Sequence, residues 1–111
     1  MENRLRMDDD ADIRRLKKGN RTWIRPLGNS MYPQIKSGQE VLLSSLNPEN
    51  SKDVSICPGD VCLCDFGDYF LLHKILYSDT RKDRFLIGDN LGNIDGWVDR
   101  KNIHGKVILI V

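Results

Sequence analysis

Gly28-Asn29-Ser30-Met31-Tyr32-Pro33 is the stretch around which the rest of the chain is organised. Gly28 and Asn29 tolerate the positive φ angles of a sharp turn, so we expect them to present Ser30 at a turn. Pro33 stiffens the exit from that turn. An exposed hydroxyl on rigid backbone suits a nucleophile, but most turn serines only hydrogen-bond their neighbours. The stretch alone therefore permits a catalytic role without establishing one.

Short β-type runs flank this turn and continue to the end of the chain. Glycine, proline, asparagine and aspartate turns separate them, and no strong helical period follows Gly19. The runs are residues 22–25, 40–43, 61–64, 69–77, 85–87, 97–98 and 105–111, with a polar surface loop expected at 47–53. This pattern predicts a mostly β domain, as a small barrel or a coiled sheet.

Length, charge and cysteine content limit the class of protein. With 111 residues and a formal net charge of +1, the chain has the size of one domain and no overall attraction to nucleic acid or anionic membrane. No apolar run approaches the ~20 residues of a spanning helix, and the N-terminus shows no secretory pattern. Three cysteines, an odd number without an export signal, favour a reducing compartment. We therefore expect a soluble cytoplasmic protein with a single domain over residues 21–111.

Residues 1–20 differ from the rest in being highly charged. Acidic residues 8–10 precede basic residues between 14 and 18, and Gly19 follows, which is typical of a short helix. Ala11, Ile13 and Leu16 supply little apolar surface, so the helix would be marginal alone. The sequence leaves open whether this segment docks on the domain or extends into solvent as an arm.

A serine nucleophile requires a base, and His73 and Lys74 are the two candidates. A neutral imidazole accepts a proton near physiological pH, and a desolvated lysine can do the same. Neighbouring residues on a strand face opposite sides, so only one of the two can reach Ser30. His73 could also be a structural residue of its strand, and spacing alone does not choose among these roles.

A third group must hold the tautomer of a histidine base, and Asp89 and Asp95 bracket a glycine- and asparagine-rich turn where it could lie. The alternative is that Asp89 and Asn90 make Asx-type turn hydrogen bonds, and this remains the favoured interpretation for Asn90 and Asn93. Backbone N–H groups of the serine turn, that of Ser30 first, would stabilise an oxyanion.

The spacing Cys62-Leu63-Cys64 could suggest a metal site. Alternate strand residues share a face, so two small apolar side chains packing together explain the pair more simply. A tetrahedral zinc site would need two further ligands, and His73 and His104 are not suitably paired for it. We expect no metal and no other cofactor.

Residues 28–35 resemble the Ser-Met-x-Pro box of type I signal peptidases and LexA-like serine peptidases, the S24/S26 superfamily. Further matches follow in the family's order: Gly-Gln-Glu-Val at 38–41, Pro-Gly-Asp-Val at 58–61, Leu-His-Lys-Ile at 72–75, Gly-Asp-Asn at 88–90 and Gly-Lys-Val at 105–107. The likeness covers residues 23–111 and implies the coiled-sheet or partial-barrel fold of that superfamily.

The resemblance also implies roles. The endoplasmic-reticulum and archaeal branch carries histidine where bacterial enzymes carry a lysine base, and His73-Lys74 is similar to its His-Arg pattern. Ser30 would then be the nucleophile and His73 the base. Asp89 and Asp95 match the two acids of that branch, with Asp95 as the orienting group.

Substrate contacts are implied in the same way. Gly28, Asn29 and Met31 would form the turn around the oxyanion site, where Gly28 stands at a position that carries a hydroxyl in some members. An extended peptide would lie between the strand at 22–25 and the strand at 69–72. The implied peptide-binding residues are Trp23, Ile24, Leu71 and Leu72.

Departures from the family limit the substrate. The sequence lacks the membrane helices of signal peptidases and the DNA-binding domain of LexA-like proteins, and Gln39 stands where Asp is common. The sole alanine, Ala11, precedes Asp12, which is no LexA-type cleavage site. We therefore expect a serine-type peptidase acting on a peptide or partner protein, of undetermined oligomeric state. The alternative is a non-catalytic peptide-binding or regulatory module with the same fold. A nucleic-acid-binding barrel is disfavoured, since no aromatic platform pairs with a basic groove.

Overall fold

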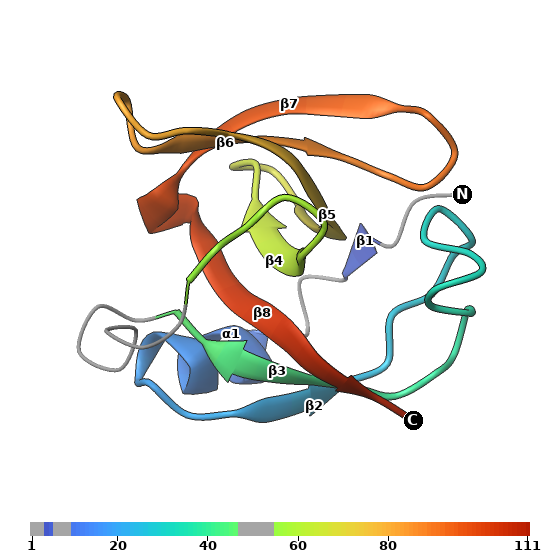
Figure 1. The fold of residues 1–111 in the computed structure, drawn as a ribbon. Coiled ribbons are helices and arrows are strands. Elements are labelled where there is room, and N and C mark those ends of the chain that lie inside the picture. The colour runs from blue at the N-terminus through green and yellow to red at the C-terminus, as the bar shows by residue number, and fades with distance from the viewer. Residues whose placement is uncertain (1–3, 6–9, 47–54) are drawn as a thin grey trace.

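The computed structural model, which describes residues 4–5, 10–46 and 55–111, is built on one antiparallel sheet (Figure 1). Its strands are β1 (Arg4–Leu5), β2 (Thr22–Ile24), β3 (Val41–Ser45), β4 (Val61–Asp65), β5 (Phe70–Asp79), β6 (Arg84–Gly88), β7 (Ile94–Asp99) and β8 (Ile103–Ile110). The helix α1 (Asp10–Lys17) precedes β2, and the 3₁₀ helix η2 (Arg100–Asn102) joins β7 to β8. The expected mostly β fold with a short N-terminal helix is confirmed.

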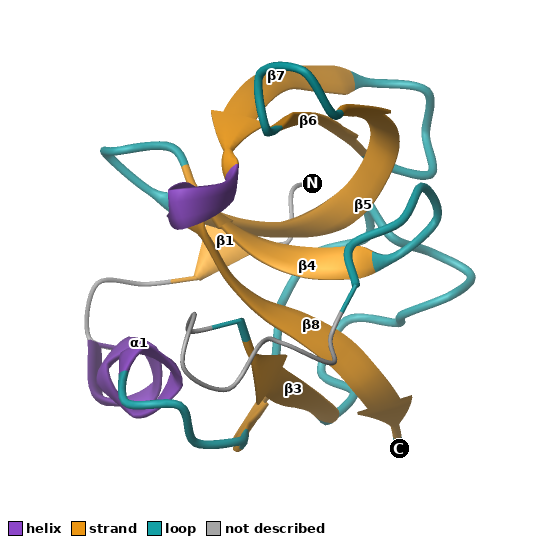
Figure 2. Cartoon of the chain, turned by 60° about the vertical axis from the view of Figure 1, so that its left-hand side comes forward, coloured by secondary structure: helices purple, strands orange, loops and turns teal. Residues whose placement is uncertain are grey.

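The strand order is β2-β3-β8-β4-β5-β6-β7, and β1 pairs with β5 off this path. The last strand, β8, therefore lies between β3 and β4 in the middle of the sheet. Register shifts interrupt the β3–β8, β4–β8, β5–β6 and β6–β7 pairs. Such bulges increase the local twist, and Figure 2 shows the resulting coiled sheet, with β5, β6 and β7 curving away from β3 and β8.

Most expected strands are present with shifted ends. β5 continues to Asp79, and β7 begins at Ile94 rather than at Trp97, because the segment taken for a turn pairs with the end of β6. The pairing of β1 with β5 was not expected from the sequence. The loop expected at 47–53 and the acidic residues 8 and 9 lie outside the described residues.

Two buried clusters pack on opposite faces of the sheet. Successive residues of β4 alternate between them: Val61 and Leu63 belong to one, and Cys62 and Cys64 to the other.

Cys62 and Cys64 thus pack as apolar side chains, as expected, and burial raises the pKa of both thiols. Within the described part of the chain no group of His, Cys, Asp and Glu side chains is arranged to hold a metal ion.

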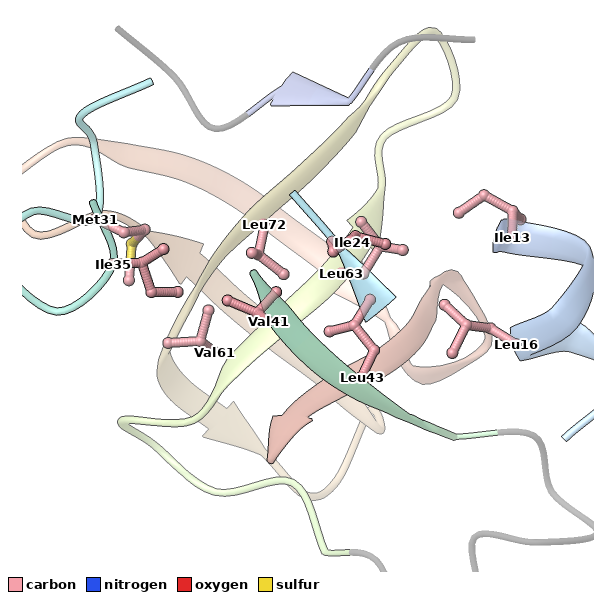
Figure 3. Packing of buried hydrophobic residues seen from close by; sticks show 10 residues of the cluster. All are labelled: Ile13, Leu16, Ile24, Met31, Ile35, Val41, Leu43, Val61, Leu63 and Leu72. Atoms are coloured by element: carbon pink, nitrogen blue, oxygen red, sulfur yellow. The ribbon is translucent and has the colours of Figure 1, made fainter. Parts of the chain in front are cut away.

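The helix α1 is docked on the sheet. Ile13 and Leu16 are buried at one end of the cluster that contains Val61 and Leu63 (Figure 3). The Ser45 hydroxyl donates a hydrogen bond to the carbonyl of Leu16 (2.5 Å), and Thr22 Oγ1 donates to Asp12 Oδ1 (2.9 Å).

The helix ends at the glycine that the sequence indicates. Gly19 has φ +91°, and the N–H groups of Gly19 and Asn20 bond to the carbonyls of Leu16 and Arg15. This is the arrangement of a Schellman C-cap. No helix of the described residues is long and apolar enough to cross a membrane.

A pair of substitutions tests the docking of α1. Leu16 is fully buried and Lys18 is exposed two positions later. We expect Leu16→Ala to lower the free energy of unfolding by about 2–5 kcal/mol, and Lys18→Ala to change it by less than about 0.5 kcal/mol. Urea unfolding measures both, and equal, near-zero effects would mean that the helix does not pack on the sheet.

Candidate active site

Three polar side chains from distant parts of the chain form a hydrogen-bonded row. Ser30 Oγ lies 2.9 Å from His73 Nε2, and His73 Nδ1 lies 2.5 Å from Asp95 Oδ2. A carboxylate accepts hydrogen bonds and does not donate them, so the Nδ1 of His73 carries the ring proton. In that tautomer Nε2 is an acceptor, and the Ser30 hydroxyl donates to it.

The turn that carries Ser30 is anchored in the core by its neighbours. Met31 and Ile35 are fully buried, and Figure 3 shows their side chains together at the opposite end of the cluster from α1. The N–H of Ile35 donates a hydrogen bond to the carbonyl of Met31 (2.9 Å), and the N–H of Tyr32 donates one to the carbonyl of Asn29 (3.1 Å). The position of Ser30 is therefore fixed by packing on one side and by turn hydrogen bonds on the other.

His73 is held by the sheet itself. It lies on β5, paired with Cys62 of β4, and its side chain is completely buried. Lys74 points to the other face of β5 and is partly exposed. The structure therefore brings His73, and not Lys74, to Ser30.

A β-bulge aims Asp95 at His73. In the β6–β7 pair, Ile87 is opposite Gly96 while Gly88 is opposite Ile94, so Asp95 is the extra residue between them. Bulges re-aim a side chain without breaking the ladder on either side. Because β6 separates β7 from β5, this displacement is what lets the carboxylate reach over the end of β6. Its side chain is 10% exposed.

Asp89 stabilises the turn rather than joining the hydrogen-bonded row. Its Oδ1 accepts the N–H groups of Leu91 and Asn93, and its Oδ2 accepts the Asn93 side-chain amide, each at 2.9 Å. Burial works against its ionisation, but the turn hydrogen bonds and nearby His73 outweigh burial and hold the pKa of Asp89 below its usual value. Asp89 therefore makes the Asx-type turn hydrogen bonds, and Asn93 donates to it through its backbone and its side-chain amide.

For Asn90 that interpretation is wrong. Its backbone N–H donates to the Ser30 carbonyl (2.9 Å), and its Nδ2 donates to the Met31 carbonyl (3.1 Å). These bonds join the 89–93 turn to the serine turn across more than half the chain. Sequence reasoning missed this contact because local turn bonding explains an asparagine at this position equally well.

Ser30 itself is 1% exposed, which corrects the expectation of an exposed hydroxyl. The physical reason is that Met31 draws the turn into the core while Asn90 docks on its other side. The other residues of the implied oxyanion site differ in exposure and hydrogen bonding. Asn29 is exposed, whereas the N–H of Gly28 donates to Ser37 Oγ at 3.0 Å and is thereby engaged. An oxyanion role for the Ser30 N–H stays a prediction.

The implied peptide-binding residues lie on β2 and β5. Trp23 is 46% exposed, but the side chains of Ile24, Leu71 and Leu72 are buried. The side chains of those three residues are therefore closed to a ligand, and the main chain of Leu71 is paired with β4 on one edge and with β1 on the other. No family model, no curated protein and no solved structure matches the chain.

The depressed pKa of Asp89 predicts a pH-dependent contribution to stability. Its stabilising effect is complete above the unfolded pKa of 3.8 and is lost as the pH falls through the lower folded value. We expect Asp89→Asn to cost about 1–3 kcal/mol near neutral pH, and this cost to shrink below about pH 4. Urea unfolding near neutral pH and again below about pH 4 measures the change in the free energy of unfolding, with the exposed change Asp99→Asn as the control. A cost that did not change with pH would contradict the role of the ionised carboxyl.

Proposed function

We propose that the chain is a serine-type peptidase domain that cleaves a peptide or partner protein by acyl transfer. Ser30 is the nucleophile, His73 the general base and Asp95 the orienting group. The row of hydrogen bonds from Ser30 Oγ through the His73 ring to Asp95 Oδ2 carries this proposal.

The chemical steps follow from the tautomer. As Ser30 Oγ attacks the scissile carbonyl carbon, its proton passes to His73 Nε2 and the carbonyl oxygen takes the negative charge. The C–N bond then breaks, and the imidazolium gives that proton to the leaving amine. Water, deprotonated by His73 in turn, hydrolyses the acyl ester and restores the Ser30 hydroxyl.

Asp95 makes this cycle possible in a buried site. Its carboxylate holds the proton on Nδ1, so that Nε2 is free to act as base, and it stabilises the imidazolium that forms during attack. Without that partner, charging a fully buried imidazole would be opposed by desolvation.

Two further observations support a catalytic role over a structural one. Replacing a buried hydrogen-bonded pair by apolar side chains of the same shape can leave stability unchanged, so stability alone does not require this row. The segments that resemble the Ser-Met-x-Pro, Leu-His-Lys-Ile and Gly-Asp-Asn boxes of the S24/S26 superfamily also supply Ser30, His73 and Asn90 in the expected order, and Asp95 follows the last of them. The proposed setting is a reducing compartment such as the cytoplasm.

Cleavage of a diverse synthetic peptide mixture, read by mass spectrometry, tests the proposal. Ser30→Ala abolishes the cuts, and His73→Ala lowers their rate by about 10²–10⁴-fold, the usual contribution of a general base. Asp95→Asn lowers it by roughly 10²-fold or more, because the amide no longer enforces the reactive tautomer. Asp99→Asn, an exposed change on the same strand, leaves the rate unaltered.

Two results would contradict the proposal. Cuts that persist in folded Ser30→Ala would assign the activity to another group or to a contaminant. Intact peptides with folded wild-type protein, combined with retention of some of them on the immobilised chain, would instead favour the non-catalytic peptide-binding module.

A further inference from the structure

The chain's own N-terminal strand occupies the edge of β5 beside His73. At Phe70 and Leu71, β4 pairs with one edge of β5 through Asp65 and Cys64. A strand has two edges, so β1, which pairs Leu5 with Phe70 and Arg4 with Leu71, must hold the other.

That second edge is the one that β6 uses further along. The β5–β6 pairing starts where Lys74 is opposite Gly88 and runs toward Asp79. β1 and β6 therefore share one edge of β5, and His73 lies between the part paired with β1 and the part paired with β6. An extended peptide that adds to β5 next to His73 has to use this edge, because β4 occupies the opposite one from residue 70 to residue 74.

We propose that β1 is a built-in competitor of the peptide substrate, so that the site is autoinhibited until β1 leaves β5. This inference rests on the proposed peptidase function. A peptide in the register of β1 that extended to His73 would pair with residues 70–73 and would overlap β1 at Phe70 and Leu71. The two cannot occupy that edge together.

The pairing of β1 with β5 is short and can open without disrupting the rest of the sheet. β1 is 2 residues long and lies off the main path of the sheet, so its release leaves every other strand pair intact. Short peripheral pairings open at a small fraction of the global free energy of unfolding. A peptide that pairs over a longer stretch of the same edge forms more main-chain hydrogen bonds than β1 and can replace it.

The test uses two variants at one position. Leu5→Pro removes a backbone N–H and cannot continue a ladder, whereas Leu5→Ala keeps the backbone able to pair. We expect Leu5→Pro to speed amide hydrogen exchange at Phe70, the residue opposite Leu5. It should also lower KM for a single peptide of the mixture, one that the wild type cuts, by roughly 5- to 30-fold with kcat unchanged. This factor is the worth of one or two backbone hydrogen bonds. Leu5→Ala should resemble wild type in both measurements, and a chain lacking residues 1–5 should repeat the proline result.

The outcomes separate this inference from the proposed function. Faster exchange at Phe70 with unchanged KM, or unchanged exchange at Phe70 in both the proline variant and the truncated chain, would overturn the competition and leave the peptidase proposal standing. Failure of all forms to cut would overturn the peptidase proposal. Retention of the same peptides on the immobilised proteins would then decide the competition: stronger retention by Leu5→Pro supports it, and equal retention overturns it.

Discussion

The hydrogen bond from His73 Nδ1 to Asp95 Oδ2 is the interaction on which the rest of the candidate site depends. It determines which ring nitrogen faces Ser30 as an acceptor, and it gives a buried imidazole the partner that it needs if it is to take up charge. The fold meets this requirement at a bulge in β7, where Asp95 is the extra residue between the positions opposite Ile87 and Gly88. The same bulge in β7 therefore interrupts the regular sheet and carries the carboxylate of the site.

The same geometry makes the site closed. Ser30 and His73 are 1% and 0% exposed, and Asn90 clamps the serine turn through the carbonyls of Ser30 and Met31. Burial strengthens each hydrogen bond of the row by excluding water, but it also keeps a scissile carbonyl away from Ser30 Oγ. Together with β1 on the edge of β5, this describes an assembled and closed row, which under the proposed function needs a local opening before it meets a peptide.

Sequence reasoning found the residues better than it found their contacts. The β period identified most strands, and the order of the motifs selected Ser30, His73 and Asp95, which the structure brings into one row. The chemistry of a residue type does not reveal a long-range partner, so Asn90 was taken for a local turn residue although it bonds to Met31. The burial of Ser30 and the pairing of Arg4–Leu5 depend on how distant segments pack, and no local pattern encodes them.

The most direct test of the central claim, that His73 activates Ser30, is covalent labelling with a small fluorophosphonate, mapped by mass spectrometry. The hydrogen-bonded row predicts one adduct, on Ser30 Oγ, with Ser37 and Ser44 unmodified. It also predicts that the labelling rate falls by about 10²-fold or more in His73→Ala, since the base that removes the hydroxyl proton is gone. The absence of an adduct at Ser30 in both the folded wild type and the chain lacking residues 1–5, or an equal rate in His73→Ala, would contradict it.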